Sequence, residues 1–172
     1  MSLLSRLLRL RGSDREALHP LWHRIVAIAR EPQWYAQCGV EDTLAGRFDA
    51  ITLVLSLVLL RIERVPALIP SAALLTELFV SDMDGQLRES GVGDLVVGKR
   101  IGRQMSVLGG RLGAYRDGLA AQDDSILCQA LERNVSMNEG ADLAALVQAA
   151  RQLAGQLKSL SDEALLAGEI PR

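Results

Sequence analysis

Residues 95–119 read LVVGKRIGRQMSVLGGRLGAYRDGL, and their apolar positions decide the class of fold that we expect. Apolar side chains recur there at spacings of three or four, which is the period of one face of an α-helix. The series is Val97, Ile101, Met105, Leu108, Leu112, Tyr115 and Leu119. Asp94 directly precedes it and is a good N-cap residue. The segment therefore predicts a long amphipathic helix that packs one face against a core.

The segments on both sides also have helical character and end at residues that stop helices. Asp42 is a candidate cap for a helix over about 43–64, and Ser71 is a candidate cap for the next helix after Pro66 and Pro70. The other predicted helices cover about 14–30, a short piece through Trp34 and Tyr35, 126–134, 141–160 and one turn after Ser161. No internal repeat, linker or alternating strand is visible. We expect an all-α fold, a compact single-domain bundle of about six to eight helices formed by residues 13–172.

The composition suits such a bundle and excludes several classes of protein. The chain has 172 residues, of which 49% are hydrophobic and 3% aromatic, so Leu, Val, Ile and Ala must build the core. A net charge of −2 gives no reason to expect nucleic acid as a partner. Cys38 and Cys128 are typical of free thiols in a reducing compartment. The longest apolar run, residues 50–60, is about half of what a membrane span needs. We therefore predict a cytoplasmic protein.

Residues 1–12 form a separate feature, a short basic amphipathic arm. Its leucines gather on one side of a helical wheel and its arginines lie opposite, which is typical of a segment that lies on an anionic membrane surface. The arginines also interrupt the leucine run, so we expect no signal peptide. The alternative is a leading turn that folds back onto the core. The candidate membrane-contact residues are Leu3, Leu4, Arg6, Leu7, Leu8 and Arg9.

Residues 78–87, LFVSDMDGQL, resemble the first motif of the haloacid dehalogenase phosphatases, an apolar strand followed by DxDG. The resemblance implies that Asp82 would attack phosphate, Asp84 would transfer the proton, and Mg²⁺ would lie between carboxylates. The flanking pattern here is helical, however, and no βα units follow. His19 and His23 have zinc-helix spacing but lack the glutamate of that motif. We therefore expect no enzyme, no catalytic residue, no metal site and no cofactor.

Glycines form a band beside the apolar stripe of the 95–119 helix. They are Gly98, Gly102, Gly109 and Gly113. Each glycine inside a helix costs about 1 kcal/mol relative to alanine, so compensating contacts are expected. Small residues allow another backbone to approach closely. Two interpretations stay open: close packing inside the domain itself, or a docking groove for a hydrophobic client segment.

Residues 79–115, FVSDMDGQLRESGVGDLVVGKRIGRQMSVLGGRLGAY, carry a more specific pattern. Its elements are Asp82-Met83-Asp84, Leu87-Arg88-Glu89, Gly91-Val92-Gly93-Asp94, Val97 with Lys99, and Gly110-Arg111 with Tyr115. The segment resembles the ubiquinol–cytochrome c chaperone family, whose members assist assembly of the cytochrome bc1 complex. Tyr35, Gly39, Asp42, Arg47 and Phe48 fit the same pattern upstream. The resemblance covers about residues 34–120, and no known pattern is recognised after residue 130.

The resemblance implies an all-helical, non-enzymatic assembly chaperone that binds newly made cytochrome b and promotes assembly of the bc1 complex. Mitochondrial members work with a second assembly protein and at the ribosome exit, and both partners stay open for this chain. The long N-terminal extension of those members is missing, which implies a bacterial member, with the arm placing it on the inner face of the cytoplasmic membrane. The candidate partner-binding residues are Asp82, Asp84, Arg88, Asp94, Lys99, Gly102, Gly109, Arg111 and Tyr115.

Other interpretations of these residues remain. Asp84, Arg88 and Asp94 can instead tie two helices together around the 91–94 turn, and Arg111 can be a structural ion-pair partner rather than a client contact. For the whole chain, the alternative is a generic helical protein-interaction module at the membrane surface. A remote alternative is a phosphatase built on the DMDG sequence.

Overall fold

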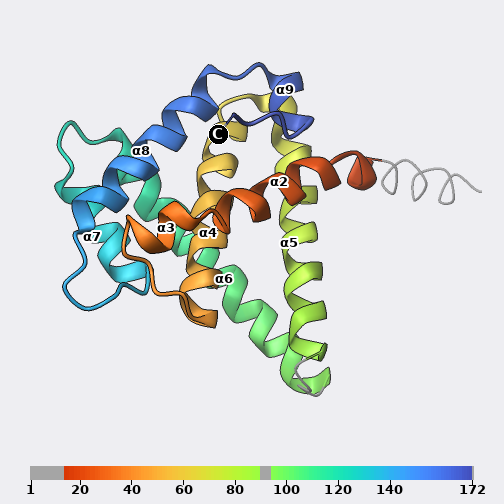
Figure 1. Cartoon of the computed structure of the whole chain (residues 1–172). Helices are drawn as coiled ribbons and strands as arrows, with labels where there is room; N and C mark the ends of the chain where they lie inside the picture. Colours follow the sequence, from red (N-terminus) through yellow and green to blue (C-terminus); the bar gives the residue numbers. More distant parts are fainter. Residues whose placement is uncertain (1–13, 90–93, 172) are drawn as a thin grey trace, which may run out of the picture.

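The computed structural model describes residues 14–89 and 94–171, and the side chains of residues 86–105 are outside the description. The predicted arm, residues 1–12, therefore lies outside the described residues. Figure 1 shows a bundle of helices around a central one. The helices are α2 (His19–Ala29), α3 (Pro32–Ala36), α4 (Leu44–Ile62), α5 (Ile69–Glu89), α6 (Asp94–Ala120), α7 (Ser125–Asn134), α8 (Leu143–Ser159) and α9 (Asp162–Leu166), with a 3-10 helix η1 (Pro66–Leu68) before α5. The predicted all-α fold of about six to eight helices is confirmed.

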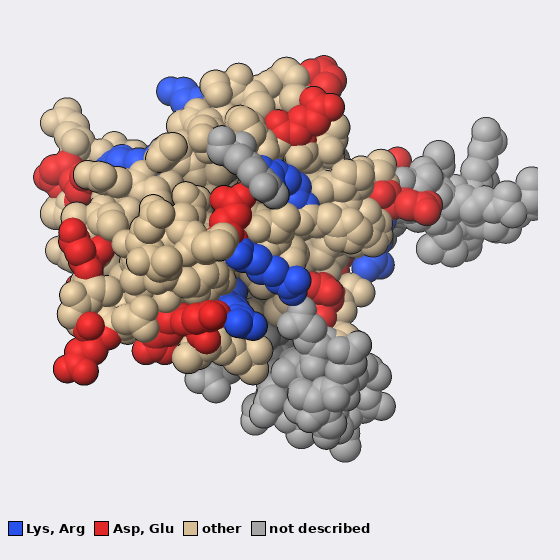
Figure 2. Space-filling model, viewed as in Figure 1, with Lys and Arg blue, Asp and Glu red and all other residues tan. Residues whose placement is uncertain are grey.

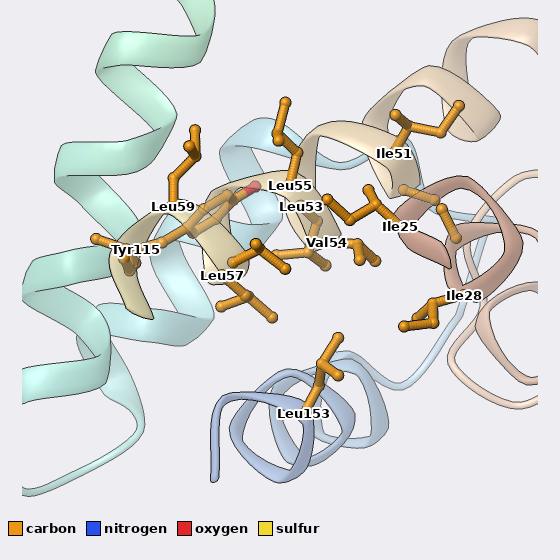
Figure 3. Close-up of a cluster of buried hydrophobic side chains, with 14 of the residues drawn as sticks. Ile25, Ile28, Ile51, Leu53, Val54, Leu55, Leu57, Leu59, Tyr115 and Leu153 are labelled. Atoms are coloured by element: carbon orange, nitrogen blue, oxygen red, sulfur yellow. The ribbon is translucent and has the colours of Figure 1, made fainter. Parts of the chain in front are cut away.

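Helix α4 is the centre of the bundle, because from Asp49 onward all of its residues except Arg61 are buried. Helices α2, α6 and α8 pack around it. Figure 3 shows Ile25 from α2, Tyr115 from α6 and Leu153 from α8 converging on the leucines and valines of α4. Each fully buried aliphatic side chain contributes about 1.5–3 kcal/mol. Among the described residues, no helix is both long enough and apolar enough to span a bilayer.

Several predicted helix ends differ from the observed ones, for local reasons. Thr43, not Asp42, caps α4, because its hydroxyl accepts a hydrogen bond from the Gly46 amide at 3.2 Å. Asp42 instead pairs with Arg47 at 2.6 Å. Helix α5 begins at Ile69, before the predicted cap Ser71, since a proline in the first turn has no amide hydrogen to lose.

The predicted 14–30 helix is likewise divided. Residues 14–17 are helical, Leu18 is a turn, and α2 begins at His19. Pro20 lies in the first turn of α2, where its ring is compatible with a helix start but not with a continuous helix through this point. The break therefore has its cause in a single residue.

Helices α5 and α6 extend beyond the rest of the bundle. Figure 1 shows their lower ends reaching past the other helices before α6 returns to the body and crosses α4. Leu108 of α6 is buried, as is Met83 of α5. The DMDG sequence lies within α5, so Asp82 and Asp84 are on a helix and not at the end of a strand. The strand-based geometry of the phosphatase motif is therefore not what this segment forms.

The C-terminal segments, for which the sequence predicted no role, complete the core. Leu146, Leu157 and Leu165 are buried, and Ile170 is buried near the end of the chain. Arginine side chains fasten these segments by donating to backbone carbonyl oxygens, some of which lie at helix C-termini, where the helix itself supplies no partner. Arg24 donates to Ile170 O, Arg61 to Leu157 O and Leu160 O, and Arg151 to Gly118 O and Leu119 O.

Candidate partner-binding site

A buried ion pair fixes the position of α6 against α4. Asp49 lies on α4 and is 7% exposed. Arg111 of α6 donates from Nη2 to Asp49 Oδ1 at 2.7 Å and from Nη1 to Thr52 Oγ1 at 2.5 Å. Ser136 donates to Asp49 Oδ2 from its amide at 3.0 Å and its hydroxyl at 2.8 Å. A single carboxylate therefore joins α4, α6 and the loop that follows α7.

Three of these residues, Asp49, Arg111 and Ser136, also line an open cleft. The Arg111 guanidinium carbon lies 5.9 Å from the centroid of the Phe48 ring, within range of a cation–π interaction. The cleft has a volume of about 330 Å³. Its lining comes from Ala45, Phe48, Asp49 and Arg111 on one side and Arg133, Asn134, Val135 and Ser136 on the other. Arg133 is exposed at the mouth. The site therefore combines an aromatic wall with two guanidinium groups.

The described part of the glycine band on α6 is open. A methyl group added at Gly109 or Gly113 would meet no other atom of the described residues within 4 Å. Close packing inside the domain, one of the two predicted roles, is therefore wrong for these two positions. Gly118, which the sequence did not single out, is the tightly packed glycine: an added methyl would lie 2.6 Å from the Leu127 Cα. Gly98 and Gly102 fall in the segment whose side-chain positions are not described.

Tyr115 lies in the core and not on a surface. Its ring is completely buried, and Figure 3 shows it among the leucines of α4. Its hydroxyl has no hydrogen-bond partner among the described residues. Burial raises the pKa of Tyr115 well above its usual range; the nearby Arg111 charge lowers it and the Asp49 charge raises it. Tyr115 therefore contributes to packing, and its predicted place on a partner surface is wrong.

The other predicted partner-binding residues fall on the α5–α6 extension. Asp82 and Asp84 are half-buried on α5. Arg88, Asp94 and Lys99 belong to the two helices, but their side chains lie outside the described ones. The predicted tie around the 91–94 turn is therefore untested. Arg111 is the ion-pair partner that one of its two interpretations predicted.

Sequence reasoning missed most of the network around Arg111. Asp49 had a usable signal, because a carboxylate at the start of a long apolar run must find a partner when it is buried. Ser136 and Arg133 had none, since they meet α4 from positions about 90 residues away along the chain. Only the packing of α7 against α6 brings them to the site.

The upstream residues that carried the resemblance shape the loop before α4. Gly39 has a φ of +74°, a conformation that favours glycine, and an added methyl would lie 2.4 Å from the Ala141 Cβ. The Tyr35 hydroxyl donates to Ala29 O at 2.7 Å. These contacts join the segment before α4 to α2 and to the loop before α8.

The surface charge around the bundle is uneven. Figure 2 shows acidic side chains gathered on the left of the view, over α7 and its flanking loops, while several basic side chains lie nearer the middle. Exposed acidic residues in those segments include Asp123, Asp124, Glu132, Glu139 and Asp142. The exposed Arg133 of the cleft is therefore close in sequence to exposed acidic residues such as Glu132 and Glu139.

A family model and a solved structure both relate this chain to the same family of proteins. The family model described as ubiquinol-cytochrome C chaperone matches residues 36–172, so the match continues to the C-terminus, beyond the 34–120 range of the sequence resemblance. The crystal structure of the Cbp3 homolog from Brucella abortus is similar, with a TM-score of 0.79 and 36% sequence identity over 98% of this chain and 95% of that one. No curated protein matches the chain.

Proposed function

Because the chain belongs to the ubiquinol-cytochrome C chaperone family, we propose that it binds newly made cytochrome b and promotes assembly of the cytochrome bc1 complex. The observation that carries the proposal is the match over residues 36–172, which includes every helix from α4 to α9. The chaperone role requires a surface that accepts an apolar client and needs no catalytic group. We therefore propose a binding protein and not an enzyme.

The open face of α6 supports a client-binding role. Gly109 and Gly113 each lower helix stability by about 1 kcal/mol relative to alanine, and no contact among the described residues compensates for this. Small residues allow a second helix to approach closely, as in membrane-helix pairs. Arg111 holds the same helix rigidly on α4. A fixed helix with an open small-residue face is therefore suited to receive a hydrophobic segment of cytochrome b.

We propose that the client surface continues along the α5–α6 extension. The residues concerned come from both helices and include charged groups that would surround an apolar contact. They are Asp82, Asp84, Arg88, Asp94, Lys99, Gly102, Gly109 and Arg111. A second assembly factor or the ribosome would use surfaces other than this one.

The decisive experiment compares two open helical glycines. Gly109→Leu places a bulky side chain on α6, and Gly155→Leu does the same on α8, where an added methyl also meets nothing within 4 Å. Both variants should fold, because both positions have space. We expect Gly109→Leu to lose co-purification of cytochrome b and to lower bc1 content, measured by haem b difference spectra, while Gly155→Leu changes neither.

Other outcomes would contradict this proposal. Normal bc1 content in a strain that lacks the gene and any paralogue would remove the chaperone role. Co-purification of unrelated proteins without cytochrome b would favour the generic helical interaction module. For Asp82 and Asp84 we propose no catalysis, since both lie within α5; Mg²⁺-dependent phosphatase turnover that Asp82→Asn abolishes would show that we are wrong.

We further propose that the N-terminal arm contacts the anionic inner face of the cytoplasmic membrane. The basis is the separation of leucines from arginines in residues 3–9. Deletion of residues 1–12 should weaken binding to vesicles that contain anionic lipid, and added salt should weaken binding of the intact chain. Equal binding by the intact and shortened chains would remove the idea.

A further inference from the structure

We infer that the cleft between α4, α6 and the loop after α7 binds an acidic peptide segment, in which a carboxylate side chain has apolar neighbours. The inference rests on the proposed function in one respect, namely that the segment belongs to the client polypeptide. The cleft itself is defined by its lining residues and does not depend on the client. It lies on a different side of α6 from the open face, because Arg111, which lines it, is two residues from Gly109 and residues two apart do not share a helix face.

The charges of the cleft favour an anion. Both oxygens of Asp49 are occupied, Oδ1 by Arg111 and Oδ2 by Ser136. The lining thus holds one carboxylate and two guanidinium groups, a net charge of +1. Arg133 donates from Nε to Gln129 O at 3.1 Å, and its Nη atoms have no hydrogen bond or ion pair within the described residues. A planar guanidinium of this kind binds a carboxylate with two parallel hydrogen bonds.

Apolar side chains flank the same cleft. Leu44 is 83% exposed and lies one turn before Phe48 on α4; Val107 is 37% exposed and lies one turn before Arg111 on α6. Residues four apart share a helix face, so both leave apolar surface next to the cleft walls. Of the four large exposed hydrophobic residues in the described part of the chain, these two each share a helix face with a residue that lines the cleft. Exposed apolar side chains near a cleft are typical of a binding surface.

The shape and surroundings favour a peptide over other anions. A small-molecule site encloses most of its ligand, whereas this cleft is open, and the exposed Leu44 directly precedes Ala45 of its lining. Nucleic acid needs a broad basic surface, and the segments around Arg133 carry exposed acidic residues such as Glu132 and Glu139. An extended peptide segment matches both the arginines and the flanking apolar side chains. Its carboxylate would lie at the arginines and its apolar side chains at the edge of the cleft.

The test uses the full chain and two synthetic peptides with blocked ends, one with a Leu-Glu-Leu centre and one with Leu-Gln-Leu. Fluorescence anisotropy measures the dissociation constant of each. We expect the Glu peptide to bind about tenfold more tightly, because hydrogen bonds between two charged groups are the stronger ones. Arg133→Gln should remove this preference and leave the weaker Gln-peptide affinity unchanged. Leu44→Ser should weaken both peptides.

Arg64→Gln is the matched control, since Arg64 is also exposed but follows the opposite end of α4. It should leave both affinities unchanged. Both arginines lie on the surface, so circular dichroism and thermal unfolding should show that each variant folds as the parent does. A preference for the Glu peptide that survives Arg133→Gln, or that Arg64→Gln removes equally, would overturn the inference.

Two further outcomes would assign the cleft to a different occupant and thereby overturn the inference. Competition by inorganic phosphate at the same concentration as the peptide would indicate a simple anion site. A dimer in sedimentation that Arg133→Gln dissociates would indicate a second copy of the chain. The peptide result is separate from the proposed function: bc1 loss in the deletion strain without peptide preference rejects only the cleft, and peptide preference with normal bc1 rejects only the chaperone role.

Discussion

Helix α6 carries glycines on two faces, and the two faces differ in what surrounds them. On the packed face, Gly118 lies so close to α7 that an added methyl would be 2.6 Å from the Leu127 Cα and 2.9 Å from its amide nitrogen. On the open face, an added methyl at Gly109 or Gly113 would contact nothing within 4 Å among the described residues. The same residue type on one helix therefore allows close packing at one site and packs against no described residue at the other.

The difference separates structural requirements from functional ones. Every interior glycine lowers helix stability by a similar amount, whichever face it occupies. At Gly118 the close approach of α6 and α7 compensates for this, since packing at this distance is possible only without a side chain. At Gly109 nothing inside the described chain does. Because the open face gains no stability from its glycines, a partner is the better reason for them.

The largest effect on stability is expected at the ion pair between Asp49 and Arg111, which holds the packed face of α6 against α4. Asp49→Ala should lower the free energy of unfolding by about 3–5 kcal/mol, because it leaves the buried Arg111 guanidinium without a counter-charge. Urea denaturation followed by circular dichroism measures the change. The double substitution Asp49→Leu with Arg111→Met should recover most of the loss. A loss below about 1 kcal/mol would mean that Arg111 reaches solvent easily.

Alanine substitutions on the two faces of α6 test whether the packed and the open glycines differ. Gly118→Ala should destabilise the fold by about 1–3 kcal/mol, since the new methyl meets the backbone of Leu127, which cannot move freely. Gly109→Ala should stabilise it by up to about 1 kcal/mol through helix propensity alone. Thermal unfolding of both variants gives the sign of each change. Equal changes of the same sign would show that the two faces do not differ.

The sequence predicted the path of α6 well but not its surroundings. The apolar stripe placed a helix at 95–119, and the structure has it at Asp94–Ala120, because the 3.6-residue period is a local property. The same projection placed Gly109 and Gly113 beside the stripe. Whether those glycines meet another helix depends on where α7 packs, which is a tertiary outcome. The stripe contains no information on that neighbour.

The site was predictable in parts for the same reason. Arg111 was named from the family pattern, and an ion pair was one of its two predicted roles. Asp49 was passed over just before the apolar run of α4, although a charge at a buried position requires a partner. Thr43 took the cap expected of Asp42, because two adjacent residues could each cap and only the backbone geometry decides between them. Local rules thus found the helices, and long-range packing chose the contacts.

A smaller effect is expected at Tyr115, whose hydroxyl lies on the packed face without a hydrogen-bond partner among the described residues. Tyr115→Phe should leave stability unchanged or raise it by up to about 1 kcal/mol, because an unpaired buried hydroxyl is unfavourable. The pH dependence should also change. Burial raises the pKa of Tyr115, so above about pH 10 the unfolded chain loses this proton first and stability falls. The Phe variant should lack that part of the alkaline loss.

The smallest effect on stability is expected at an ion pair that lies on the surface. Arg116 of α6 donates one hydrogen bond to each carboxylate oxygen of Glu63, at 2.8 and 2.9 Å. Paired hydrogen bonds of this kind have favourable geometry. The two side chains are 49% and 37% exposed, so water screens the attraction and competes for the same groups. Arg116→Ala should therefore destabilise by at most about 0.5 kcal/mol, and less at high salt. Urea denaturation at two salt concentrations measures this. A loss near that of Asp49→Ala would mean that geometry, and not burial, sets the strength of the contacts between α4 and α6.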